Sequence, residues 1–171
     1  YQNKENFTYF FSNYITEWGF ATWRRMWKTY DVNMSDWNRV QKRKILSEAC
    51  CSWRAKRGLR KMFDLHCNNP KPLAWGYQWY FNCISNEALS ITPRANMSLN
   101  IGFERDDSTN TFGENPVASS LNECTFPLIH PTSISRDRSF DRAIEEIVCP
   151  SDFNFWSYRI RNKIKSICSE K

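Results

Sequence analysis

The chain has 171 residues, a formal net charge of +6 and 41% hydrophobic residues, with an aromatic content of 16%. This length indicates one domain that can bury a core of its own, and no run of 18 apolar residues is present that could span a membrane. The first residues lack the charged and apolar regions of a signal peptide, and the chain does not begin with Met. We therefore expect it to start inside a longer gene product or after processing.

Alternation and helical periodicity predict a mixed order of strands and helices. Residues 1–15 alternate Phe and Tyr with polar partners, which is typical of a strand or extended arm. Apolar residues at helical spacing then predict a series of helices, at residues 20–30, 40–50, 52–66, 74–85, 138–147 and 153–168. Residues 40–50 and 52–66 are expected to form either two helices or one bent helix. A second strand is expected at residues 89–92. The connections are polar or rich in proline, at residues 31–37, 68–72, 94–116 and in much of 117–150. With so few strand candidates, the expected fold class is α/β, with a mixed short sheet that is incomplete, flanked by helices, and leaves an apolar face uncovered.

Charged residues are distributed unevenly along the chain. Residues 24–61 hold twelve Lys or Arg against three Asp or Glu, whereas residues 87–146 hold five against ten. The basic first third favours an anionic partner such as a phosphate, a nucleic acid or a membrane surface, although a solvated basic helix face explains it as well.

Seven cysteines without any C-x-x-C spacing argue against a zinc site and predict mostly buried, reduced thiols.

The stretch Trp18–Trp27 contains three Trp and two Arg around Gly19. A plain core would use Leu, Ile and Val, whereas Trp beside Arg suits stacking on rings and forked contacts with carboxylate or phosphate. The alternative is an aromatic corner of the core, with Arg stems packed over it.

Few other residues point to chemistry. The P-loop, the dinucleotide-binding glycine motif and the G-x-S-x-G motif are all absent. His66 and His130 stand far apart without metal-ligand spacing and favour structural roles. Glu104, Asp106 and Asp107 form the one dense acidic group, which could bind a cation, act as a base or accept sugar hydroxyls, or be a solvated loop.

Three blocks occur in a fixed order over nearly the whole chain. The first runs from Tyr9 to Met34 and contains WGFATWRR at residues 18–25, and the second runs from Phe63 to Trp79 and contains WGYQW at residues 75–79. The third runs from Leu89 to Asp137 and contains LSITP at residues 89–93 and NIGF at residues 100–103. Together they resemble the C-terminal, acceptor-side half of bacterial-type nucleotide-diphospho-sugar transferases of the GT-A fold. The order is also similar to that of the eukaryotic N-acetylglucosaminyltransferase group.

This resemblance implies a function and a division of the chain. Residues 1–150 would be the acceptor-side part of a glycosyltransferase domain, and residues 151–171 a basic amphipathic C-terminal helix suited to peripheral membrane contact. The enzyme would move a sugar from a nucleotide-diphospho-sugar to a hydroxyl of a carbohydrate or lipid-linked acceptor. The substrate-binding residues implied are Trp18, Trp23, Arg24, Arg25, Trp75, Tyr77, Gln78 and Asn100. We expect Trp18, Trp23 and Trp75 to lie near one another and near Asp106 or Asp107.

Departures from the family pattern favour a second interpretation, an inactive carbohydrate-binding remnant of the same fold. The family usually has Asp, the candidate general base, where this chain has Gly76, so that Asp106 or Asp107 would have to replace it. Asn110 stands where the family has His. The nucleotide-binding half with its Asp-x-Asp motif is not in this chain, and a divalent cation, Mn or Mg, is expected only with that half.

The same resemblance implies the cellular compartment of the protein. It predicts a cytoplasmic protein, either free or peripheral to the inner membrane, or one of the Golgi lumen if the source is eukaryotic. A nucleic-acid-binding module using the basic, aromatic first third is the least favoured alternative, because no recognition motif supports it.

Overall fold

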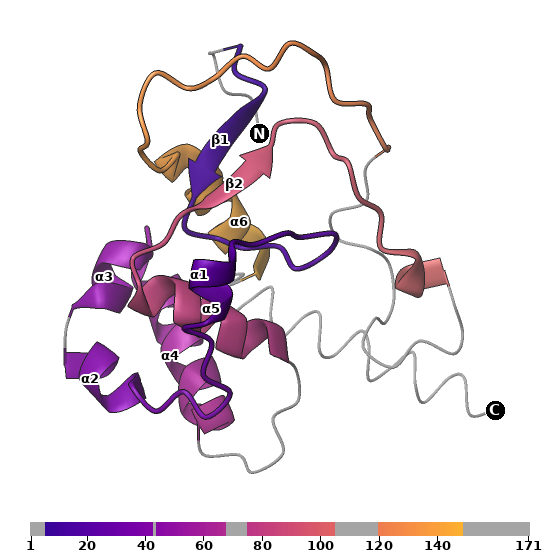
Figure 1. Cartoon of the computed structure of the whole chain (residues 1–171). Helices are drawn as coiled ribbons and strands as arrows, with labels where there is room; N and C mark the ends of the chain where they lie inside the picture. Colours follow the sequence, from indigo (N-terminus) through magenta and orange to yellow (C-terminus); the bar gives the residue numbers. More distant parts are fainter. Residues whose placement is uncertain (1–5, 43, 68–74, 105–119, 149–171) are drawn as a thin grey trace.

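The computed structural model describes residues 6–42, 44–67, 75–104 and 120–148. Helices dominate these ranges, and they group below a small sheet with α6 behind it (Figure 1). In chain order the elements are β1 (Tyr9–Ser12), α1 (Arg24–Trp27), α2 (Trp37–Lys42), α3 (Ile45–Ala49), α4 (Trp53–Cys67), α5 (Trp75–Ser85), β2 (Ser90–Pro93), the 3-10 turn η1 (Ile101–Glu104) and α6 (Arg138–Val148).

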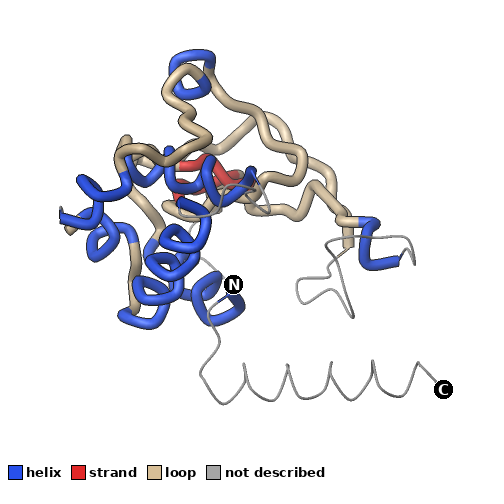
Figure 2. The backbone as a smooth tube through the Cα atoms, turned by 90° about the horizontal axis from the view of Figure 1, so that it is seen from below, coloured by secondary structure: helices blue, strands red, loops and turns tan. Residues whose placement is uncertain are grey.

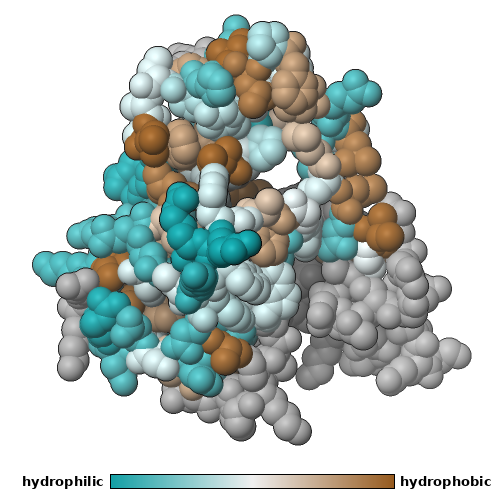
Figure 3. Space-filling model, viewed as in Figure 1, coloured by the Kyte–Doolittle hydropathy of each residue, from teal (hydrophilic) through white to brown (hydrophobic). Residues whose placement is uncertain are grey.

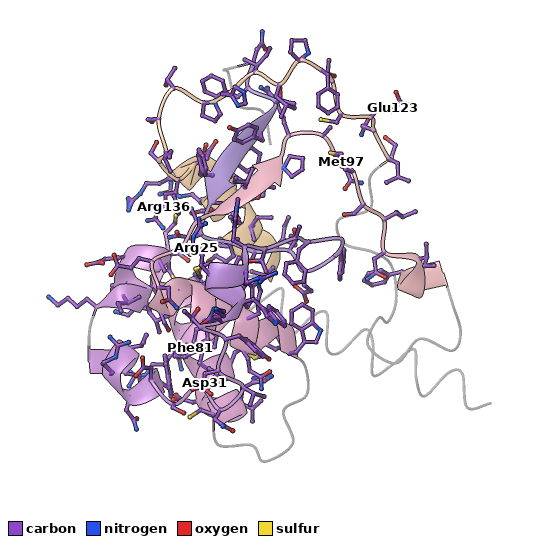
Figure 4. All side chains as sticks on the ribbon, in the orientation of Figure 1. Arg25, Asp31, Phe81, Met97, Glu123 and Arg136 are labelled. Carbon is purple, nitrogen blue, oxygen red and sulfur yellow. The ribbon has the colours of Figure 1, made fainter. Side chains whose placement is uncertain are left out.

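Helices α2, α4 and α5 meet in the core, to which α3 adds the buried side chains of Ile45, Leu46 and Ala49. Helix α4 buries Ala55, Leu59 and Phe63, which recur every four residues and so fall on one face of the helix. The Phe63 ring, fully buried, meets Trp37 of α2 at 5.4 Å and Phe81 of α5 at 5.5 Å, both edge to face. Each such ring contributes about 1.5–3 kcal/mol by burial, so these contacts fix α5 against the other two helices. Figure 4 labels Phe81 among the helices.

The sheet described has two antiparallel strands, β1 and β2. Its register pairs Tyr9 with Pro93 and Ser12 with Ser90. Two strands alone are marginally stable in water because they have too little apolar surface to bury. Helix α6 provides a packing partner for them. Phe140 of α6 packs on Phe10 at 4.4 Å, and an isolated parallel bridge joins Phe11 to Arg136.

Most expected elements occur in the described residues, with three differences in extent. The helices expected at 74–85 and 138–147 are α5 and α6, and the strand expected at 89–92 is β2. The helix expected at 20–30 is shorter, because α1 covers only residues 24–27. The helix expected at 40–50 is divided into α2, which already begins at Trp37, and α3. The strand expected within residues 1–15 is β1, which covers only residues 9–12 in the described part of the chain. The helix expected at 153–168 lies outside the described residues.

The α/β expectation holds only coarsely, since the described part is a mostly helical domain with a two-stranded antiparallel sheet. The reason is that the large apolar residues are used in helix faces, as in α4 and α5, rather than in further strands. Figure 2 shows the chain from below, with the short strands near the middle of the view and helices on several sides of them. None of the helices in the described ranges is long and apolar enough to cross a membrane.

Candidate functional site

A group of aromatic rings forms where the segment around α1 meets the start of α5. Trp27 lies 5.3 Å from the nearly parallel ring of Tyr30 and 5.3 Å from Trp79. Phe20 lies 5.4 Å from Trp75 and 5.9 Å from Trp79. We call these five residues the aromatic platform. Trp79 is buried at its base, whereas Trp27 and Trp75 are 49% and 45% exposed, so the platform offers flat apolar faces to a ligand.

Turn geometry brings the α1 segment to this position. Gly19 has a φ of +69°, a left-handed conformation that other residues adopt reluctantly, and it reverses the chain before the platform. After α1, the Asp31 carboxylate accepts hydrogen bonds from the backbone N–H groups of Asn33, at 2.9 Å, and Ser35, at 2.7 Å. The Ser35 bond is the main reason that the pKa of Asp31 lies below its usual value. The segment between these two turns is therefore held in a defined loop.

Gln78 fastens this loop to α5. Its side chain is 1% exposed, accepts a hydrogen bond from the Tyr30 hydroxyl at 3.0 Å, and donates one to the Val32 carbonyl at 3.0 Å. Both ends of the amide are thus used inside the protein. Gln78 was expected to bind substrate, but its position makes it a support beneath the platform.

Two exposed arginines border the platform. The Arg25 guanidinium lies 5.2 Å from the centre of the Trp23 ring, a cation–π arrangement, and Trp23 is 54% exposed. Arg24 is exposed beside it, and Trp18 is 42% exposed in the turn before Gly19. Figure 4 labels Arg25 on α1, the short helix that also contains Trp27 of the platform.

A carboxylate from this loop occupies the space above Gly76. A Cβ atom added at Gly76 would lie 2.8 Å from Oε1 of Glu17. The same charge adds to burial, the larger effect, in raising the pKa of Tyr77, whose ring packs 4.5 Å from that of His66. Glu17 was not among the residues expected in the site, because it is far from position 76 in the sequence. The feature that could have pointed to it is its position directly before Trp18-Gly19, in the first of the resembling blocks.

The structure joins two of the three expected blocks. Residues 17–30 and 75–79 meet through Glu17, Phe20 and Gln78, whereas Asp106 and Asp107 lie outside the described residues. Asn100 accepts a hydrogen bond from the Gly102 N–H at 2.9 Å and so shapes the η1 turn. Figures 1 and 2 both place η1 apart from the helices.

Sequence reasoning missed a buried charged network at the junction of β1, α6 and the α3–α4 connection. Asp141 is fully buried and Glu145 is 3% exposed. Oδ1 of Asp141 accepts a hydrogen bond from the Ser12 hydroxyl at 2.6 Å, and Oε1 of Glu145 accepts bonds from the Tyr14 hydroxyl at 2.8 Å and the Cys51 N–H at 2.6 Å. The signal that could have found it is the spacing of two acids four residues apart on one helix face.

Arg136 provides the positive charge of this network. Its guanidinium donates to the Ala49 carbonyl at 2.6 Å and lies 3.6 Å from Asp141. Figure 4 labels it between the sheet and the helices. Burial is nevertheless the largest influence on Asp141 and raises the pKa of that carboxyl. Because all three groups are largely enclosed, the network serves to hold α6 in place rather than to meet a substrate.

Other candidate chemistry is limited within the described residues. No three His, Cys, Asp or Glu side chains converge there into a group that could hold a metal ion. Cys50, Cys51, Cys67, Cys83 and Cys124 are free thiols, as expected, although only Cys50 and Cys83 are fully buried. The aromatic platform with its arginines and Glu17 is therefore the described surface best suited to bind a ligand: rings can stack on it, and charges at its edge can bind hydroxyls or anions.

Comparison of the chain with protein-family models, with curated proteins and with solved structures gives no match.

Proposed function

We propose that this chain is the acceptor-side part of a sugar-nucleotide-dependent glycosyltransferase, and that the aromatic platform binds the carbohydrate acceptor. The observation that carries the proposal is the half-exposed ring surface built jointly by residues 17–30 and 75–79. Sugar rings present apolar C–H faces and a rim of hydroxyls, so they suit a flat aromatic floor with charged groups at its edge. The resemblance of the same two blocks to nucleotide-diphospho-sugar transferases supports the transfer reaction.

Glu17 is the proposed general base. Its carboxylate stands where an Asp side chain at position 76 would extend, and it is exposed at the edge of the platform. In the proposed step it takes the proton from the acceptor hydroxyl, the hydroxyl oxygen bonds to the anomeric carbon, and the nucleoside diphosphate leaves with the electron pair of the broken bond. Glu17 thus replaces Asp106 or Asp107, which were expected from the sequence to act as the general base.

Binding of carbohydrate without transfer is the second candidate. Gly76 favours it, because the family's usual acid is absent from that position. The two candidates share the platform and differ only in whether a donor is consumed.

The experiment uses the complete reading frame from which the chain comes. Binding of an oligosaccharide panel is measured by calorimetry, and release of nucleoside diphosphate from nucleotide-sugar donors is measured in parallel. Trp75→Ala is expected to weaken acceptor binding about tenfold, because it removes one half-exposed ring of the platform. Glu17→Gln is expected to lower donor turnover by about 10²–10⁴ while leaving acceptor binding within about threefold.

Trp53→Ala is the matched control. Trp53 is 62% exposed and is the first residue of α4, as the 45% exposed Trp75 is the first residue of α5, but Trp53 does not belong to the platform. Equal losses in Trp75→Ala and Trp53→Ala would contradict the platform as the binding surface. Binding that depends on Trp75 without any donor turnover would favour the second candidate.

A further inference from the structure

A small basic pocket lies on the side of the helical core formed by α2, α3 and α4. It encloses about 100 Å³, and its apolar floor includes the buried side chains of Val40 and Leu46. The remaining lining residues are polar or positively charged: Gln41, Lys44, Ser47, Lys56 and Arg60. Figure 3 shows hydrophilic side chains over the side of the molecule where Figure 1 places α2 and α3.

The pocket gathers three cations without a carboxylate in its lining. Lys44, Lys56 and Arg60 have no Asp or Glu oxygen within salt-bridge distance among the described residues. Lys56 and Arg60 stand four residues apart on α4, and like charges at that spacing destabilise a helix. An anion bound between them would remove this repulsion, so the arrangement is suited to a negatively charged ligand.

Neighbouring side chains orient the donors of this pocket. The Lys56 ammonium donates a hydrogen bond to the Ser47 hydroxyl, and Arg60 lies 3.4 Å from Oε1 of Gln41. The Gln41 amide is itself directed, because its NH₂ group donates to the Asp64 carboxylate at 2.9 Å. Asp64 also accepts the indole N–H of Trp37 at 2.8 Å, which ties the arrangement to the core. Arg60 is thus held against the pocket by contacts that lead into the packed interior.

We propose that this pocket binds a phosphate group. A compact tetrahedral anion with several oxygens can accept bonds from a guanidinium, two ammonium groups and the Ser47 hydroxyl at once. The small volume fits a single phosphate rather than a flat ligand such as a nucleobase, and the apolar floor limits how far water competes. The phosphate can belong to a soluble phosphomonoester or to a lipid headgroup, and both present the same chemistry. The inference does not depend on the function proposed for the aromatic platform.

The test is titration of the full chain with inorganic phosphate at fixed ionic strength, followed by two-dimensional NMR. We expect saturable shifts of the Ser47 amide and the Gln41 side-chain NH₂, which line the pocket. The double variant Lys56→Gln with Arg60→Gln is expected to raise the apparent Kd at least about tenfold, because two charge-assisted contacts are lost.

Arg57→Gln with Lys61→Gln is the matched control. It removes one Arg and one Lys from exposed positions of the same helix that do not line the pocket, so net charge changes equally. Equal weakening in both double variants, or shifts that do not saturate, would overturn the proposal, since either would indicate nonspecific screening.

Vesicles distinguish the two sources of phosphate. Flotation is measured with phosphatidylcholine vesicles containing phosphatidic acid, and with vesicles that contain phosphatidylserine at equal surface charge. Pocket-dependent binding to phosphatidic acid alone assigns a lipid headgroup. Binding of inorganic phosphate without binding of vesicles assigns a soluble phosphomonoester. Failure of both probes overturns the proposal.

Discussion

A glycine at position 76 leaves room for a side chain that comes from another part of the chain. Gly76 is the second residue of α5, where glycine costs about 0.5–1 kcal/mol relative to alanine. A Cβ there would meet the Glu17 carboxylate at 2.8 and 3.1 Å. An Asp at this position would therefore bring two carboxylates together, so Gly76→Asp would not simply add an acid to the site.

The first prediction concerns the phenol next to Glu17. The pKa of Tyr77 is raised chiefly by burial and further by the Glu17 charge, which disfavours the phenolate. Glu17→Gln is therefore expected to lower the pKa of Tyr77 while leaving it above the usual value of 10.0, since burial remains. Titration of ¹³C-labelled tyrosine by NMR measures the change.

Tyr30 provides the internal control for this titration. Its pKa is raised by burial and by Asp31, not by Glu17, so it should keep the same midpoint in both proteins. A midpoint for Tyr77 that does not move would show that the Glu17 carboxylate lies farther from the phenol than in this structure.

At the scale of elements, α6 is fastened by polar contacts rather than by a large apolar face alone. Asp141 and Glu145 accept bonds from Ser12 and Tyr14 of the β1 end and from the Cys51 N–H before α4. Paired charges in the interior give little net stability, but removing one partner is costly. The helix is thereby fixed in one position relative to both the sheet and the helical core.

A second prediction follows from the raised pKa of Asp141. Because the folded protein binds this proton more tightly than the unfolded chain, the contribution to stability is present below the unfolded pKa, about 4, and is lost as pH rises through the folded pKa. Asp141→Asn is expected to remove this part of the slope of unfolding free energy against pH. Urea unfolding at a series of pH values from about 4 to 8 measures it.

Asp31→Asn is the opposite control for the same measurement. The pKa of Asp31 is lowered, so its contribution is present above the unfolded pKa and is lost as pH falls. The two variants should change the slope in opposite directions. Identical slopes for the native protein and Asp141→Asn would show that the carboxyl is not desolvated.

The sequence predicted elements with a clear period and failed where contacts are distant. Helices α5 and α6 and strand β2 could be placed because apolar spacing and proline mark them locally. The contact of Glu17 with Gly76 and the network around Asp141 could not, because each joins segments far apart in the chain. Neither the spacing of apolar residues nor a sequence motif specifies such pairs. From the sequence alone, these acidic residues would be predicted to be exposed to solvent.

For the molecule as a whole, the aromatic platform depends on the core below it. Helix α5 carries Trp75 and Trp79 of the platform and also Phe81, whose ring packs 5.5 Å from Phe63. The platform has no sheet beneath it in the described residues, so its geometry rests on the packing of α5 against α2 and α4. Loss of core packing and loss of the platform should therefore occur together.

Phe63→Ala tests this coupling. The side chain is fully buried and contacts Trp37, Tyr80 and Phe81, so its truncation should lower the free energy of unfolding by about 3–5 kcal/mol. Leu65→Ala, on the same helix but 52% exposed, should cost at most about 0.5 kcal/mol. The chain has eight Trp, so fluorotryptophan NMR signals assigned to Trp27, Trp75 and Trp79 are used to report on the platform, and far-ultraviolet circular dichroism reports on the helices. One common transition, shifted only in Phe63→Ala, is the expected result, because α5 links the two regions. A platform transition that precedes helix loss, or that stays at its original midpoint in Phe63→Ala, would show that the rings are held by the α1 loop alone.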